Sequence, residues 1–208
     1  MSAHDSRFVV ALTGGVAAGK SAAAVRFAAH GIEVLDADRA ARDVVAPGSA
    51  GLAALVDAFG AGILDADGAL DRPAMRRRAF ADPAVRRQLE AVIHPRVRQW
   101  LRSRVEASAG PYAMLMIPLL AENRAAYRWV DRVLVVDVPA AVQRDRLIRR
   151  DGIDPALAQR MLDAQASRAE RLALADDVID NTGDEAGLDA AVAALHRQYL
   201  TLAAQRHG

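Results

Sequence analysis

The segment Gly14–Ser21 constrains the fold of this chain more than any other. Its residues, GGVAAGKS, fit the phosphate-binding pattern of Gly, four residues, then Gly-Lys-Ser. The apolar residues 8–12 before it are typical of a buried strand, and residues 22–29 after it are almost all good helix formers. A strand, a glycine-rich loop and a helix in this order direct backbone N–H groups and the positive end of the helix at a polyphosphate. We therefore predict a nucleotide phosphate site here.

The two residues that end this motif have chemical roles of their own. We expect Lys20 to reach the β- and γ-phosphates of ATP and the Ser21 hydroxyl to bind Mg²⁺. Lys20 is the only lysine in the chain, so a compact ammonium group is kept where phosphates need it, while arginine and histidine supply the other positive charges. The predicted nucleotide-binding residues of the loop are Gly14, Gly15, Ala17, Ala18, Gly19, Lys20, Ser21 and Ala22.

Composition excludes several other classes of protein. With 208 residues, 52% hydrophobic and 25% charged, the chain is globular and long enough for a well-buried core. The absence of cysteine excludes disulfides and cysteine nucleophiles, and the five histidines show no metal-ligand spacing. A net charge of +1 and 4% aromatic residues argue against a nucleic-acid partner. No apolar run approaches the roughly 20 residues of a membrane span. The polar first residues predict no signal peptide, which favours a cytoplasmic protein, and nothing in the sequence specifies an oligomeric state.

Apolar runs alternate with helical segments along the chain. This alternation predicts an α/β fold of the P-loop NTPase type, with three layers and a five-stranded parallel sheet. A final amphipathic helix is expected over residues 186–204. The expected strands are residues 8–12, 32–35, 112–117, 132–138 and 177–179.

Residues 47–110 have helical rather than alternating periodicity and are punctuated by proline and glycine. We predict a mostly helical insertion that holds the phosphoryl acceptor. Most of its many arginines are expected to lie on a solvated helical surface. A few of them are available to bind an anionic substrate. The dipeptide His94-Pro95 predicts a kink or a break in a helix.

Two aspartates, Asp36 and Asp38, follow the second expected strand. In an open parallel sheet, ligands collect at the carboxyl ends of the strands. One of the two is a candidate N-cap for the following helix, which leaves the other for chemistry.

The reaction class follows from what accompanies the phosphate loop. A GTPase normally carries an Asn-Lys-x-Asp element, which a chain with one lysine lacks. A motor ATPase places an acidic residue at the end of a core strand, but here two strands end in Ile117-Pro118 and Val138-Pro139, with Asp137 one residue early. A small-molecule kinase remains, and it needs a lid that excludes water. We assign the lid to the arginine-rich residues 143–171, with a long helix expected after Asp154-Pro155 through Gln159, Gln165, Arg168 and Arg171.

In order and spacing, these motifs resemble those of bacterial dephospho-CoA kinases from Ala11 to Asn181. The matching pieces are Ala11–Gly15 with Gly19–Ser21, Asp36–Asp38 with Ala41-Arg42, His94-Pro95, Pro118–Leu120 with Glu122, Val133–Asp137, Gln143, Arg146, Arg150-Asp151, Gln165, Arg168 and Ala175–Asn181.

The resemblance implies transfer of the ATP γ-phosphoryl group to the ribose 3′-hydroxyl of dephospho-CoA, the last step of coenzyme A biosynthesis. It implies a nucleotide-binding core (1–46, 111–142 and 172–208), a CoA-binding insertion (47–110) and a lid (143–171). Asp38 is then the candidate general base or orienting carboxylate, in agreement with its place at a strand end. By the same resemblance, Arg146, Arg150 and Arg168 meet nucleotide and phosphates, Asn181 lies near the adenine, and Arg42, His94, Pro118, Leu119 and Glu122 lie on the acceptor side.

The chain departs from the family pattern inside the loop. Ala17-Ala18 replaces the usual Gly-Ser, and Ala22 replaces a common threonine. Alanine is acceptable there unless a position demands a positive φ, and the lost hydroxyls predict somewhat weaker ATP binding. Two alternatives to the assigned reaction are another nucleoside-monophosphate-like or small-molecule kinase and an ATP-dependent regulatory protein that transfers no phosphate.

Overall fold

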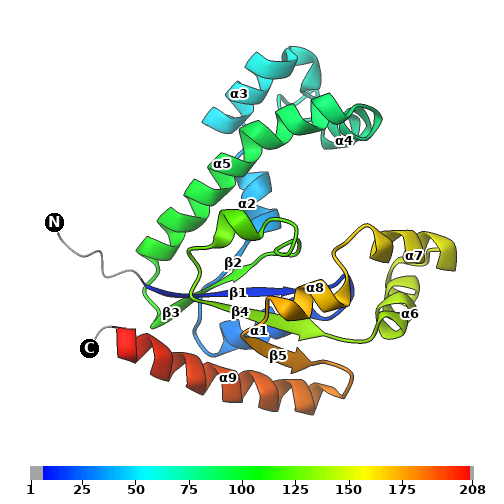
Figure 1. Cartoon of the computed structure of the whole chain (residues 1–208). Coiled ribbons are helices and arrows are strands. Elements are labelled where there is room, and N and C mark those ends of the chain that lie inside the picture. Colours follow the sequence, from blue (N-terminus) through cyan, green and yellow to red (C-terminus); the bar gives the residue numbers. More distant parts are fainter. Residues whose placement is uncertain (1–6, 207–208) are drawn as a thin grey trace. The chain divides into compact units, whose positions relative to one another are not determined.

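The computed structural model describes residues 7–206, which form two compact units. The first unit contains the chain up to Asp36 and from Val105 onward, and the second is Ala37–Arg104. The polar segment 1–6, on which the signal-peptide prediction rests, lies outside the described residues. The first is called the sheet unit below and the second the helical unit (Figure 1).

The sheet unit is built on five parallel strands. The order β2-β3-β1-β4-β5 puts the strand that leads into the phosphate loop at the centre, with all seven of its residues buried. Burial on both faces explains why the strands are continuously apolar rather than alternating. The predicted five-stranded parallel sheet is confirmed. Its strands are β1 (Phe8–Gly14), β2 (Val34–Asp36), β3 (Tyr112–Met116), β4 (Arg132–Asp137) and β5 (Asp177–Asp180).

Helices cover this sheet on both sides. Phe27 of α1 and Tyr199 of α9 pack with Phe8 of β1 in one buried core, while α8 lies on the other side of β4 (Figure 1). The first and last predicted helices are confirmed, and Gly31 follows α1 with a φ of +80°, as expected of a helix-ending glycine. The helices of this unit are α1 (Lys20–Ala29), α6 (Ala140–Asp151), α7 (Pro155–Asp163), α8 (Arg168–Ala173) and α9 (Glu185–Arg206), with a 3₁₀ turn at Arg124–Tyr127.

The helical unit has its own hydrophobic core. Leu55, Ile63 and Met75 are almost fully buried there, so the unit does not depend on the sheet for all of its apolar contacts. Its helices are α2 (Ala37–Asp43), α3 (Ala50–Phe59), α4 (Arg72–Ala81) and α5 (Pro83–Ala107), with a 3₁₀ turn at Ala61–Ile63, and the boundary with the sheet unit falls within α5.

Two helix predictions need correction. Helix α5 continues through Pro95 for 25 residues, so the His94-Pro95 dipeptide does not break it. The expected long helix after Asp154 is two helices, α7 and α8. The second begins anew because Ser167 and Glu170 form a capping box, in which each side chain accepts a hydrogen bond from the other residue's backbone N–H.

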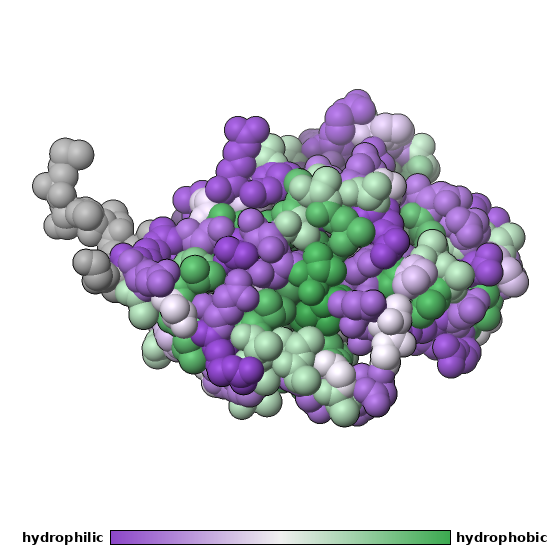
Figure 2. Space-filling model, turned by 60° about the horizontal axis from the view of Figure 1, so that its bottom comes forward, coloured by the Kyte–Doolittle hydropathy of each residue, from purple (hydrophilic) through white to green (hydrophobic). Residues whose placement is uncertain are grey.

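The surface on the α9 side is mostly hydrophilic, with hydrophobic residues gathered near its middle (Figure 2). No helix within residues 7–206 is long and apolar enough to cross a membrane.

Candidate active site

The phosphate loop connects the end of β1 to the start of α1. Gly14 has φ +150° and Gly19 has φ +103°, a region that favours glycine. Space is equally tight, because a Cβ on Gly14 would lie 2.3 Å from the Val136 carbonyl oxygen and one on Gly19 would lie 2.1 Å from Nδ2 of Asn181. Two glycines of the motif are therefore required both by the backbone conformation and by the space around them.

Ala17, in the middle of the loop, also has a positive φ, at +56°. It is the only non-glycine residue with such a backbone within residues 7–206. The condition under which alanine is unfavourable at this position is therefore met, because a Cβ makes the left-handed region less stable by about 1 kcal/mol.

The reactive side chains of the motif lie in the first turn of α1. The Lys20 ammonium donates to the carbonyl oxygens of Gly14 and Gly15, at 2.9 Å each. Its positive charge is thus held over the loop. Ser21 follows in the same turn with an exposed side chain.

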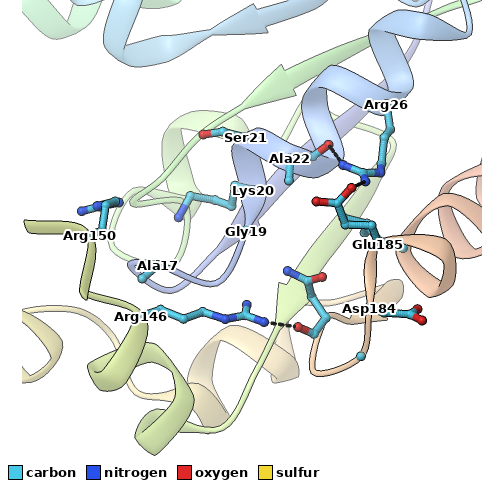
Figure 3. Close-up of a pocket in the computed structure, with 13 residues that line it drawn as sticks. Ala17, Gly19, Lys20, Ser21, Ala22, Arg26, Arg146, Arg150, Asp184 and Glu185 are labelled. Carbon is cyan, nitrogen blue, oxygen red and sulfur yellow. Dashed lines mark hydrogen bonds and ion pairs between the residues drawn. The ribbon is translucent and has the colours of Figure 1, made fainter. Parts of the chain in front are cut away.

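A cavity of about 550 Å³ opens beside the loop (Figure 3). Four cationic side chains line it, against two carboxylates. It brings together eight of the predicted site residues: Ala17, Gly19, Lys20, Ser21, Ala22, Arg146, Arg150 and Asn181. The further lining residues are Arg26, Gly183, Asp184, Glu185 and Leu188.

Arg146 and Asn181 fix the far wall of this cavity. Arg146 of α6 donates to the Asn181 carbonyl oxygen at 2.8 Å (Figure 3). The Asn181 amide donates to the Ala18 carbonyl oxygen at 2.8 Å. The loop after β5 is thereby tied both to α6 and to the phosphate loop.

The two other predicted arginines are each bonded to a carboxylate. Arg150 forms a bidentate pair with Asp151, at 2.6 and 2.8 Å. Arg168 lies outside the cavity lining and donates to Asp137, at 2.7 Å for the shortest contact. In each case the carboxylate hydrogen bond raises the pKa of the arginine above its ordinary value. Asp137, the last residue of β4, therefore points to Arg168.

The predicted acceptor-side residues fall in both units. Pro118, Leu119 and Glu122 follow β3 in the sheet unit, where a Glu122 carboxylate oxygen accepts from the Ala166 N–H at 2.8 Å. In the helical unit, Asp38 lies in the first turn of α2 and Arg42 in its last turn, and His94 lies within α5.

Sequence reasoning missed several residues of the site. Arg26 and Glu185 line the cavity and form an ion pair, with 3.6 Å between the guanidinium nitrogen and the carboxylate oxygen (Figure 3). Asp184 precedes α9 and accepts from the Gly187 N–H at 2.9 Å, so an aspartate directly before a helix was an available signal for a turn at this wall. The pairing of Arg26 with Glu185 has no signal in the sequence, because the two residues are far apart in the chain.

Comparison with known proteins gives consistent results. A family model described as dephospho-CoA kinase matches residues 8–186. The chain is similar to a dephospho-CoA kinase of Thiobacillus denitrificans, with 50% identity over 96% of this chain and 98% of that protein. Its similarity to a dephospho-CoA kinase of Xanthomonas campestris is 56% identity over 86% of this chain and 87% of that protein. A crystal structure from Thermus thermophilus aligns with a TM-score of 0.77 and 29% identity, covering 92% of this chain and 97% of that one.

Proposed function

Because this chain belongs to the dephospho-CoA kinase family, we propose that it transfers the γ-phosphoryl group of ATP to the ribose 3′-hydroxyl of dephospho-CoA. The products are CoA and ADP, and the reaction is the last step of coenzyme A biosynthesis. The proposal includes a cytoplasmic location.

The observation that carries the proposal is the cavity beside the phosphate loop. Lys20, Arg146 and Arg150 line it together, which suits a triphosphate of several negative charges. The two carbonyl contacts of Lys20 are weak partners for an ammonium group compared with phosphate oxygens. Lys20 exchanges them for the β- and γ-phosphates when ATP binds.

Magnesium binding at this site fits the residues present. Mg²⁺ is usually held by one or two protein oxygens together with substrate phosphates and water, and the Ser21 hydroxyl lines the same cavity as Lys20. Within residues 7–206 no group of three or more histidine, aspartate or glutamate side chains could hold a metal ion by itself. Ser21 is therefore the proposed protein ligand, and the metal would neutralise charge on the phosphates.

The chemical step requires a proton acceptor for the ribose hydroxyl. The 3′-oxygen attacks the γ-phosphorus, the bond from that phosphorus to the β–γ bridging oxygen breaks, and ADP leaves. We assign the hydroxyl proton to the Asp38 carboxylate, which must come within hydrogen-bonding distance of the hydroxyl in the reactive complex.

Arg150 and Arg168 are the proposed lid arginines. Each is bonded to a carboxylate, Asp151 or Asp137, so each already meets a planar anion in the geometry that a phosphoryl oxygen needs. Exchange of that carboxylate for the transferring phosphoryl group stabilises the charge of the transition state.

The helical unit supplies a second cavity, of about 520 Å³, which we assign to the acceptor. Four arginines and six apolar residues line it together, and the predicted residue Arg42 is one of the arginines. A ligand with a diphosphate and a long, weakly polar arm matches this combination. The lining residues are Arg42, Leu70, Arg72, Met75, Arg76, Ala79, Phe80, Arg86, Leu89 and Ile93.

An acceptor panel tests the proposal. ADP release is measured with MgATP and dephospho-CoA, AMP, CMP or shikimate, and again with excess EDTA. We expect turnover with dephospho-CoA alone and its loss in EDTA. Turnover with a different acceptor identifies another small-molecule kinase, and slow hydrolysis that no acceptor changes identifies a regulatory ATPase. Turnover that EDTA leaves unaffected contradicts the role given to Ser21.

A further inference from the structure

One residue of the phosphate loop is held from both sides by glutamine side chains. The Val16 N–H donates to Oε1 of Gln165 at 2.9 Å, and the Val16 carbonyl oxygen accepts from Nε2 of Gln143 at 3.1 Å. Gln143 belongs to α6, and Gln165 lies between α7 and α8. Both backbone groups of Val16 are thus paired with side chains more than 100 residues away in the chain.

Each glutamine is itself held in place. Gln143 is buried, with 3% of its surface exposed, and its Nε2 lies only 1.8 Å from where a Cβ on Gly15 would be. The backbone after Gln165 is also fixed, since the Ala166 N–H donates to Glu122 and its carbonyl oxygen accepts from Arg171. The amide groups that contact Val16 are therefore preorganised.

The Gln143 contact determines which way the next peptide group faces. In a trans peptide the C=O of one residue and the N–H of the following residue point in opposite directions. With its oxygen on Gln143, the Val16–Ala17 peptide directs the Ala17 N–H away from that glutamine. Ala17 lines the nucleotide cavity, and backbone N–H groups of such a loop are phosphate donors.

This orientation of the Val16–Ala17 peptide gives Ala17 a backbone conformation that alanine disfavours. Ala17 has φ +56°, and rotating the Val16–Ala17 peptide by about half a turn would bring its φ to a negative, β-region value. The same rotation would break the bond to Gln143 and turn the Ala17 N–H around. The Gln143 contact and the preference of Ala17 therefore oppose one another. Gln165 holds the preceding Gly15–Val16 peptide, because the Val16 N–H belongs to that group.

We propose that Gln143 is a positioning residue that keeps the Val16–Ala17 peptide in its ATP-binding orientation against the preference of Ala17 for negative φ. The inference rests on ATP binding at this loop, as proposed above. It explains how alanine serves at a position where the resembling family usually has glycine.

Gln143→Met and Gln165→Met test the proposal, because methionine keeps the volume of glutamine and removes its hydrogen-bonding groups. The dissociation constant of MgATP is measured by calorimetry without acceptor, and folding is followed by urea denaturation. We expect Gln143→Met to bind MgATP about tenfold more weakly, because the turned Ala17 N–H no longer donates a charge-assisted hydrogen bond to a phosphate oxygen. Gln165→Met leaves the contact of the Val16–Ala17 peptide in place and should weaken binding by no more than about threefold. Gln159→Met is the matched control, since Gln159 is exposed on α7 and its side chain donates to Asp163, away from the phosphate loop. This variant should bind MgATP as the wild type does.

The Ala17→Gly background separates positioning from packing. Glycine adopts φ +56° without strain, so the orientation no longer needs Gln143, and Gln143→Met should weaken MgATP binding by no more than about threefold. Equal weakening by Gln143→Met in both backgrounds would show that Gln143 only supports the fold and would overturn the proposal. If Gln143→Met does not fold, Gln143→Leu removes the same hydrogen-bond donor and gives the same comparison.

Failure of this inference is distinguishable from failure of the proposed function. A wild-type protein that does not bind MgATP contradicts both. A wild-type protein that binds it, with Gln143→Met binding equally well, contradicts the positioning role alone.

Discussion

Lys20 is a single cation held by carbonyl oxygens of its own loop. Both Gly14 and Gly15 accept from its ammonium group, and no other lysine exists in the chain to replace it. An arginine is longer and planar, so it does not reproduce a compact ammonium group between phosphates. This position therefore requires the compact shape of lysine as well as its positive charge.

Lys20→Ala should lower kcat by at least about a hundredfold, because the transferring phosphoryl group loses a positive charge in a site of low dielectric. The protein should remain folded, since the lost contacts are two partly exposed hydrogen bonds worth about 1 kcal/mol each. Steady-state ADP release and thermal melting measure the two effects. Activity near that of the wild type would show that Lys20 does not contribute to phosphoryl transfer.

Asp38→Asn should act mainly on kcat, lowering it by about 10²–10⁴-fold while the KM for dephospho-CoA changes little, because an amide cannot take the hydroxyl proton. Asp43→Asn is the control, as Asp43 is at the other end of α2 with an ion pair to Arg39 at 3.9 Å. A change confined to KM would make Asp38 a binding residue only.

At the scale of elements, helix boundaries depended on capping that the sequence shows only in part. The aspartate-proline start of α7 was predictable, because Asp154 accepts from the Leu157 N–H at 2.8 Å and Pro155 needs no donor in the first turn. The start of α8 was missed, although Ser167 and Glu170 have the spacing of a capping box. Arginine-rich helical periodicity on both sides of the break concealed it.

Ser167→Ala should lower the free energy of unfolding by about 1 kcal/mol, since the Glu170 N–H loses its side-chain partner. The midpoint of urea denaturation measures the change. Ser103→Ala, at an exposed position inside α5, is the matched control and should leave stability equal or slightly higher, because alanine is the better helix former. An equal loss of unfolding free energy in both variants would contradict the capping role of Ser167.

At the scale of the whole molecule, Asp177 connects three elements of the sheet unit. Its carboxylate accepts from Arg132 of β4 at 2.8 Å and from the Tyr199 hydroxyl of α9 at 2.9 Å. Burial raises the pKa of Asp177, but the hydrogen bonds from Arg132 and Tyr199 outweigh it, so the pKa lies below the ordinary value of 3.8. The stabilisation is therefore complete above pH 3.8 and is lost as the pH falls through the lower folded pKa.

Asp177→Asn should lower the free energy of unfolding by about 2 kcal/mol at pH 7, because Arg132 and Tyr199 lose a charged partner. The difference from the wild type should shrink as the pH falls below 4, where the wild-type carboxylate begins to protonate in the unfolded state. Urea midpoints at pH 7, 5, 4 and 3 measure this difference, with Asp57→Asn, at an exposed position of α3, as the control. A difference in unfolding free energy that does not vary with pH would show that the variant loses packing rather than the charge of Asp177.

The predictable parts of this molecule are those with local signals. The continuous apolar runs of β1 and β4 and the glycine-lysine-serine motif specify sheet, loop and helix within 20 residues or fewer. The contacts of Gln143 and Gln165 with Val16 join residues 127 and 149 positions apart, and the sequence carries no trace of them. Likewise Arg168 meets Asp137 only once the fold has formed.

The central claim is a phosphoryl transfer to one hydroxyl of one acceptor. The most direct measurement is the ³¹P NMR spectrum of the product formed from MgATP and dephospho-CoA by the wild-type enzyme. We expect one new phosphomonoester resonance, whose coupling places it on the ribose 3′-oxygen, in equal amount to the ADP formed. Inorganic phosphate in place of that resonance, or a phosphate on any other atom of the acceptor, would contradict the account.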